Sequence, residues 1–122
     1  MGYYPYGNKY KSKKTPCMYG HMHDSAKEAE RCNELHLLLK AGKIESLEVQ
    51  KSYELVPSIK YDKPMKNERK AEYKADFVYF DKELGKTVIE DTKGFRTKDY
   101  VLKRKIIKEK YCCNGNTIFI ET

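Results

Sequence analysis

The chain has 122 residues, which suits a single domain with a core of modest size. Its 39% of hydrophobic and 12% of aromatic residues exclude a disordered protein, and no apolar run is long enough to span a membrane. The formal net charge of +7 favours a polyanionic partner, because basic patches release the counterions of DNA or RNA.

Residues 1–16 are predicted to form a flexible basic arm, in which tyrosines and lysines alternate with glycine and proline without any period. Residues 17–122 are predicted to form one domain. It opens with a short, ambiguous segment at 17–23 that could be a strand. A helix is predicted over residues 25–41, because Asp24 and Ser25 are good N-caps and apolar residues recur at helical spacing on its inner face. These are Ala26, Ala29, Cys32, Leu35 or His36, and Leu39.

Strand patterns follow this helix, with a second helix before the last strand. The first strand has a break near its middle, and the polar residues 58–69 after it read as a hairpin loop or a flexible excursion. The predicted strands are 46–56, 71–81, 87–93 and 117–120, and the second helix is 97–111. A helix between the last two strands suits a parallel crossover, so the class is α/β with a mixed central sheet flanked by helices.

The strand at 87–93 carries the sharpest chemical signal, the segment Ile89-Glu90-Asp91-Thr92-Lys93-Gly94. Asp91 and Lys93 are two residues apart, so in a strand they point to the same face. Asp76 lies within an apolar run of the preceding strand, where a charge is costly unless it is paired or bound to metal. Two such carboxylates could share a magnesium ion, while the lysine assists the attacking water and offsets charge on a phosphate.

The spacing of Asp76 from Asp91-x-Lys93, on adjacent strands, resembles the signature of the PD-(D/E)XK nuclease superfamily. The predicted element order resembles the αβββαβ core of these restriction-endonuclease-like proteins. With the segment from Asp24 to Arg31, the chain resembles more narrowly a group of small phage-encoded proteins that are catalogued as a domain of unknown function. Ala75 stands where the superfamily often has proline. The resemblance implies Mg²⁺ or Mn²⁺ held by Asp76 and Asp91, with Glu28 as a third ligand.

Each of these residues also has a plainer interpretation. Ser25-x-x-Glu28 is a capping box, in which the glutamate would cap the helix instead of binding metal. Asp76 and Asp91 could pair with lysines. Glu90 points to the opposite face from Asp91 and is predicted to form a structural salt bridge. Gln50 could position a water or a phosphate, although it could equally be an exposed strand residue.

The four cysteines are predicted to be free thiols, because the N-terminus lacks a secretory signal and a reducing cytoplasmic location is expected. Cys17, His21 and His23, with Cys32 beyond them, suggest zinc. Their spacing matches no common structural zinc motif, and there is no Cys-x-x-Cys pair, so the spacing argues against such a site.

DNA is the predicted partner, bound through its backbone and its shape rather than its sequence. The residues predicted to contact it are Lys9, Lys11, Lys13, Lys14, Arg96, Lys98, Lys103 and Arg104. The resemblance implies a metal-dependent endonuclease in phage DNA metabolism, within the host cytoplasm. Its substrate could be branched DNA such as a Holliday junction, a replication intermediate, or host DNA. Resolution of a junction would require a homodimer. The alternatives are a catalytically silent DNA-binding protein and a phage protein that binds a host protein.

Overall fold

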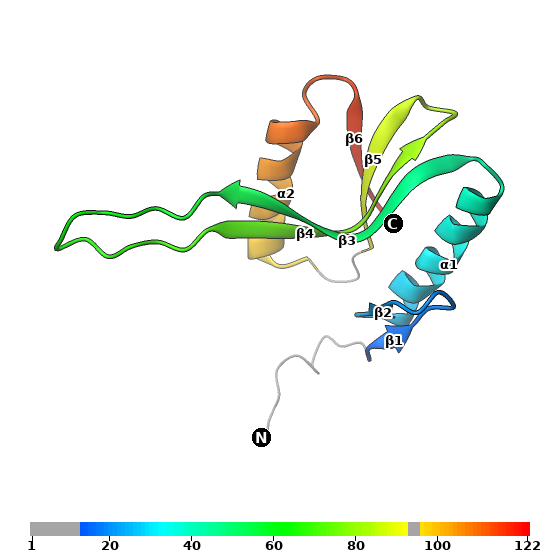
Figure 1. The fold of residues 1–122 in the computed structure, drawn as a ribbon, viewed down its shortest axis with the longest axis horizontal. Coiled ribbons are helices and arrows are strands. Elements are labelled where there is room, and N and C mark those ends of the chain that lie inside the picture. Colours follow the sequence, from blue (N-terminus) through cyan, green and yellow to red (C-terminus); the bar gives the residue numbers. More distant parts are fainter. Residues whose placement is uncertain (1–12, 93–95) are drawn as a thin grey trace.

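The computed structural model describes residues 13–92 and 96–122, and its elements follow the predicted order (Figure 1). The α/β expectation is confirmed, since two helices accompany a mixed four-stranded sheet. The elements are β1 (Thr15–Pro16), β2 (Met22–His23), α1 (Ala26–Lys40), β3 (Ile44–Val56), β4 (Ala71–Asp81), β5 (Lys86–Asp91), α2 (Lys98–Tyr111) and β6 (Thr117–Glu121).

The main sheet has the strand order β3-β4-β5-β6. β3, β4 and β5 are consecutive antiparallel strands, whereas β6 pairs in parallel with β5. The chain between β5 and β6 contains α2, as a parallel crossover requires. The predicted crossover is therefore confirmed, and β4 and β5, which carry Asp76 and Asp91, are the two inner strands of the sheet.

Helix α1 forms where caps and periodicity predict it. The Ser25 hydroxyl accepts a hydrogen bond from the backbone N–H of Glu28 at 3.1 Å, and the chain leaves the helix at Gly42, whose φ of +76° favours glycine. Ala29, Cys32 and Leu35 are buried as expected. Ala26 is exposed and Leu39 is 36% exposed, so the predicted places of these two residues on the inner face are wrong. The shorter buried stripe places α1 against β3 and the β1–β2 ribbon.

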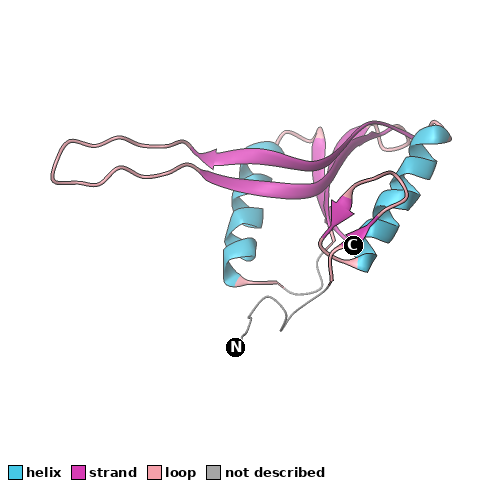
Figure 2. Ribbon diagram, turned by 60° about the horizontal axis from the view of Figure 1, so that its bottom comes forward, coloured by secondary structure: helices cyan, strands magenta, loops and turns pink. Residues whose placement is uncertain are grey.

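Two apolar clusters lie on opposite faces of the sheet, each covered by one helix (Figure 2). On the α1 side, Cys32 and Leu35 pack with Phe77 and Val88. On the α2 side, Tyr100 and Ile107 of the helix pack with Val78 and Ile89 of the strands. Alternate residues of β5 thus serve opposite faces, because side chains alternate along a strand.

The β3–β4 hairpin bends where it leaves the body of the protein (Figure 2). Gln50 in β3 has a φ of +57°, and it lies between the register pairs Val49–Phe77 and Lys51–Ala75, opposite Asp76. Along β4 the side-chain alternation also changes there, because Ala75 packs in the α2-side cluster and Phe77 in the α1-side cluster. The strand itself continues through Gln50 without interruption, so a bend beside Asp76 stands where a break was predicted.

Beyond the bend, β3 and β4 continue into a long projecting hairpin whose loop comprises residues 57–70 (Figure 1). An isolated bridge between Ile59 and Glu68, with backbone hydrogen bonds of 2.9 and 3.0 Å, holds the two sides together. Of the two interpretations of residues 58–69, the hairpin loop is therefore the one observed.

The N-terminal ribbon pairs β1 with β2 in antiparallel register, Thr15 opposite His23 and Pro16 opposite Met22. The arm predicted for residues 1–16 is thus too long at its C-terminal end, because Thr15 and Pro16 belong to the ribbon. Residues 1–12 lie outside the described part of the chain. None of the helices in the described ranges is long and apolar enough to cross a membrane.

Candidate functional site

Asp76 and Asp91 come together through the register of β4 and β5. Phe77 pairs with Glu90 in this antiparallel ladder, so the next step along both strands places Asp76 opposite Asp91. Asp76 is 8% exposed and Asp91 is fully buried. Two carboxylates without direct access to bulk water therefore share one face of the sheet, where their charges require compensation.

The local hydrogen bonds hold both carboxylates in place. Asp76 Oδ2 accepts from the backbone N–H of Thr92 at 2.8 Å and from its hydroxyl at 2.9 Å. Asp91 Oδ2 accepts from the Tyr73 hydroxyl. Burial and the neighbouring charge of Asp91 raise the pKa of Tyr73, so this phenol remains a donor at neutral pH. No ion pair joins Asp76 to a lysine within the described residues, so its predicted alternative role is not observed there.

Glu28 is the third buried carboxylate, supplied by the first turn of α1. Its backbone N–H is capped by Ser25, but its side chain does not complete the capping box: Oε2 accepts instead from His23 Nδ1 at 2.7 Å. Burial raises the pKa of Glu28, and so does the charge of Asp76, while the hydrogen bond from His23 lowers it. The influence of Asp76 shows that Glu28 and Asp76 interact electrostatically.

Glu90 serves the opposite face, as predicted. Its buried carboxylate accepts from Arg31 Nε at 2.6 Å and from Nη2 at 3.1 Å, which is a bidentate ion pair between β5 and α1. The hydroxyls of Tyr79 and Thr122 donate to it at 2.6 and 3.1 Å. The predicted structural salt bridge is confirmed, and it fastens the helix that carries Glu28 to the strand that carries Asp91.

Two further residues belong to the predicted site: Gln50, which could position a water or a phosphate, and Lys93, which was predicted to be catalytic. Gln50 lies opposite Asp76, but its side-chain amide donates to the backbone carbonyl of Met22 at 3.1 Å, which ties the ribbon to the main sheet. Lys93 lies outside the described residues. Its predicted position beside Asp91 therefore stays a prediction from the strand register.

Several cations predicted to contact DNA are engaged within the protein. Lys14 pairs with Asp24 at 2.7 Å, and Lys103 lies 3.6 Å from Asp99. Arg96 and Arg104 both form ion pairs with the carboxylate of Glu121, at 3.2 and 2.8 Å. The surface around these two arginines is therefore less positive than the sequence suggests. Lys9 and Lys11 lie outside the described residues. Lys13 and Lys98 are exposed, in keeping with a surface role.

The projecting hairpin carries a basic surface that the sequence analysis did not single out. Its loop, residues 57–70, contains five basic side chains against Asp62 and Glu68, and all five are exposed. They are Lys60, Lys63, Lys66, Arg69 and Lys70. A two-stranded ribbon has the width to enter the major groove of B-DNA. The sequence already shows an excess of basic residues in this loop. Only the pairing of β3 with β4 shows that the loop projects from the body of the protein.

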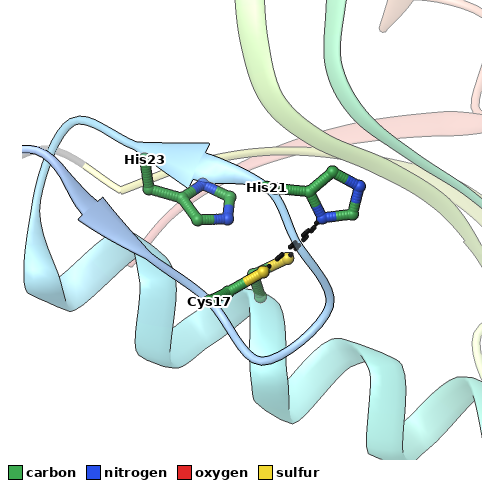
Figure 3. A group of neighbouring side chains, drawn as sticks. Cys17, His21 and His23 are labelled. Carbon is green, nitrogen blue, oxygen red and sulfur yellow. Dashed lines mark hydrogen bonds between the residues drawn. The ribbon is translucent and has the colours of Figure 1, made fainter.

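A second cluster of ligand-type side chains lies at the start of the chain. Cys17, His21, His23 and Cys32 bring their ligand atoms to within 4.8 Å of one another (Figure 3). Three of them come from the β1–β2 ribbon and its turn, and Cys32 comes from the second turn of α1. The spacing of these residues along the sequence does not predict this cluster, because Cys32 comes from the helix that packs against the ribbon.

A protein-family model matches residues 7–120, nearly the whole chain, and its family is described as a protein of unknown function, DUF1064. Searches of the curated proteins and of the solved structures found no match. The expected resemblance to a domain of unknown function is therefore confirmed. The chain belongs to the DUF1064 family.

Proposed function

We propose that this protein is a metal-dependent DNA endonuclease of the PD-(D/E)XK type. The observation that carries the proposal is the pair of buried carboxylates Asp76 and Asp91 on adjacent strands β4 and β5, with the buried Glu28 of α1 near enough to Asp76 for that charge to raise its pKa. Buried acids of like charge are unfavourable together, and a hard divalent cation with oxygen ligands removes that cost. Their location on an αβββαβ arrangement of elements supports the same superfamily.

Asp76, Asp91 and Glu28 would hold the Mg²⁺ or Mn²⁺ ion. A cation bound there would polarise a phosphodiester and lower the pKa of a bound water. The hydrogen bonds from Thr92 and Tyr73 fix the orientation of the two strand carboxylates, leaving little reorganisation for binding. Lys93, two residues beyond Asp91, would orient the attacking water and offset negative charge on the phosphate.

The basic surface supports DNA as the substrate. The hairpin loop and the exposed lysines of α2 lie on segments adjoining β4 and β5, which carry the carboxylates. Such side chains contact phosphates and fix the position of a duplex without reading its sequence. A substrate defined by shape, such as a four-way junction, fits this pattern. Symmetric cleavage of a junction would need two copies of the site and hence a homodimer, acting in the cytoplasm.

Cleavage of end-labelled DNA tests the proposal. The substrates are duplex, single strand, flap and four-way junction, each with Mg²⁺ or Mn²⁺. We expect the native protein to cut at least one of them, and Asp91→Asn and Lys93→Ala to bind the same DNA without cutting. Asp99→Asn is the matched control, because Asp99 is an exposed aspartate on α2, and it should retain activity.

The other outcomes separate the alternatives. DNA binding without cleavage by the native protein under either metal would reject catalysis in favour of a silent DNA-binding protein. Absence of any salt-dependent DNA binding would reject both and leave the protein-binding alternative.

A further inference from the structure

The cluster of Cys17, His21, His23 and Cys32 includes none of the proposed catalytic residues, although His23 is hydrogen-bonded to Glu28, and the proposed nuclease chemistry does not use it. Cys32 and His23 are fully buried, and Cys17 is nearly so. We infer that these four side chains form a structural zinc site that fastens the β1–β2 ribbon to α1. Two thiolates and two imidazoles are a donor set typical of tetrahedral Zn²⁺, whereas Mg²⁺ prefers oxygen.

Two of the separations between ligand atoms match those of a tetrahedral centre. With Zn–S near 2.3 Å and Zn–N near 2.05 Å, tetrahedral angles place sulfur and nitrogen about 3.6 Å apart. His21 Nδ1 lies 3.6 Å from Cys17 Sγ and 3.6 Å from Cys32 Sγ. The side chains of Cys17, His21 and His23 converge from the ribbon toward α1 (Figure 3).

His23 presents its remaining nitrogen to the cluster. Its Nδ1 is hydrogen-bonded to Glu28 Oε2, and since an ionised carboxylate can only accept, Nδ1 carries the proton. Nε2 is then a lone-pair donor, and it is buried without a hydrogen-bond partner among the described residues. A carboxylate behind a ligating histidine is the usual arrangement that fixes the tautomer of a metal-bound imidazole. A zinc ion would occupy the position that this nitrogen otherwise leaves unsatisfied.

The backbone around the cluster is arranged as a ligand loop. Cys17 N–H donates to the His21 carbonyl at 2.9 Å, and Tyr19 N–H donates to Cys17 Sγ at 3.4 Å, which stabilises a thiolate. Gly20, with a φ of +89°, allows the tight turn between the two ligands. The loop is therefore closed on itself before any metal binds.

The β1–β2 ribbon is also too small to be stable without an additional link to α1. Each of its strands has two residues, and its methionines, Met18 and Met22, are 80% and 55% exposed. A ribbon this small buries too little apolar surface to be stable alone, and metal ions commonly supply the missing stability in small elements. Through His23 and Glu28, the same fastening would hold one of the proposed catalytic carboxylates in position.

Metal content measured by mass spectrometry tests the inference. The protein is loaded with zinc under reducing conditions and then desalted. We expect one zinc per chain, reduced to near zero in the Cys17→Ser/Cys32→Ser double variant. Cys113→Ser is the matched control, because Cys113 is an exposed cysteine outside the cluster, and it should keep its zinc. Asp91→Asn should also keep its zinc, since Asp91 is not one of the four ligands.

Cobalt substitution of the native protein guards against misfolded variants. We expect the intense visible bands of tetrahedral Co²⁺ with a thiolate charge-transfer band. Chelation should accelerate hydrogen exchange at the Cys17 amide, which is protected by the His21 carbonyl. Zinc content well below one per chain, an oxygen-type octahedral cobalt spectrum, or zinc that Asp91→Asn loses while the double cysteine variant retains it would each overturn the assignment.

Discussion

The Arg31–Glu90 ion pair gives the sharpest test of how the candidate site is held together. Arg31→Ala removes both guanidinium hydrogen bonds to a fully buried carboxylate. Breaking one partner of a buried pair typically costs about 3–5 kcal/mol, because the remaining charge is uncompensated. Here the value should lie near the lower limit, about 3 kcal/mol, because Tyr79 and Thr122 still donate to Glu90.

Urea denaturation followed by circular dichroism measures this loss, and the thermal midpoint should fall by about 12 °C for a chain of this size. Glu34→Gln is the control. It removes only the exposed 3.0 Å contact between Arg31 and Glu34, which should be worth at most about 0.5 kcal/mol. If Arg31→Ala and Glu34→Gln cost the same, the buried pair does not hold α1 to β5 and the reasoning fails.

Two further predictions concern the charged surface. The double variant Lys63→Ala/Lys66→Ala, in the projecting loop, should weaken DNA binding similarly for all sequences. It should also reduce the slope of log affinity against log salt by up to about 2. The control is Lys82→Ala, at the opposite end of the hairpin, which should leave this slope unchanged. Filter binding at several salt concentrations checks this, and an unchanged slope would remove the hairpin from the interface. Glu121 is the basis of the second prediction: burial opposes its ionisation, but hydrogen bonds from Tyr100, Arg96 and Arg104 outweigh burial and lower its pKa to about 2 from 4.5. A depressed folded pKa means that its stabilisation is complete above about pH 4.5 and is lost as the pH falls toward 2, so urea midpoints should decline over that window and decline less in Glu121→Gln. Equal pH dependence in both proteins would contradict the assignment.

Local sequence signals located most of the elements. The cap at Ser25 and the spacing of Ala29, Cys32 and Leu35 predicted α1, because both signals arise within a few turns of helix. The alternation at the start of the segment and the apolar run that follows it predicted β4 with its observed bounds. The opposite facing of Glu90 and Asp91 followed from the two-residue period of a strand.

The same local reasoning was weaker at helix faces and charged surfaces. Leu39 has helical spacing, yet no other element covers it fully, and it is 36% exposed. The cations Arg96 and Arg104 were predicted to face DNA, but β6 brings Glu121 to both of them. That contact joins residues more than fifteen positions apart, and a charge count along the chain cannot register it.

The sequence by itself therefore determined the order and type of the elements and the identity of the acids that could do chemistry. Only the tertiary structure decided what those residues meet. The β4–β5 register places Asp76 opposite Asp91. The packing of the ribbon on α1 brings His23 to the Glu28 carboxylate, which binds this histidine instead of capping the helix. It also gathers Cys17 and Cys32 across fifteen residues. The physical reason is that propensity, capping and alternation act over a few residues, whereas ligand geometry depends on contacts between elements that the chain brings together only on folding.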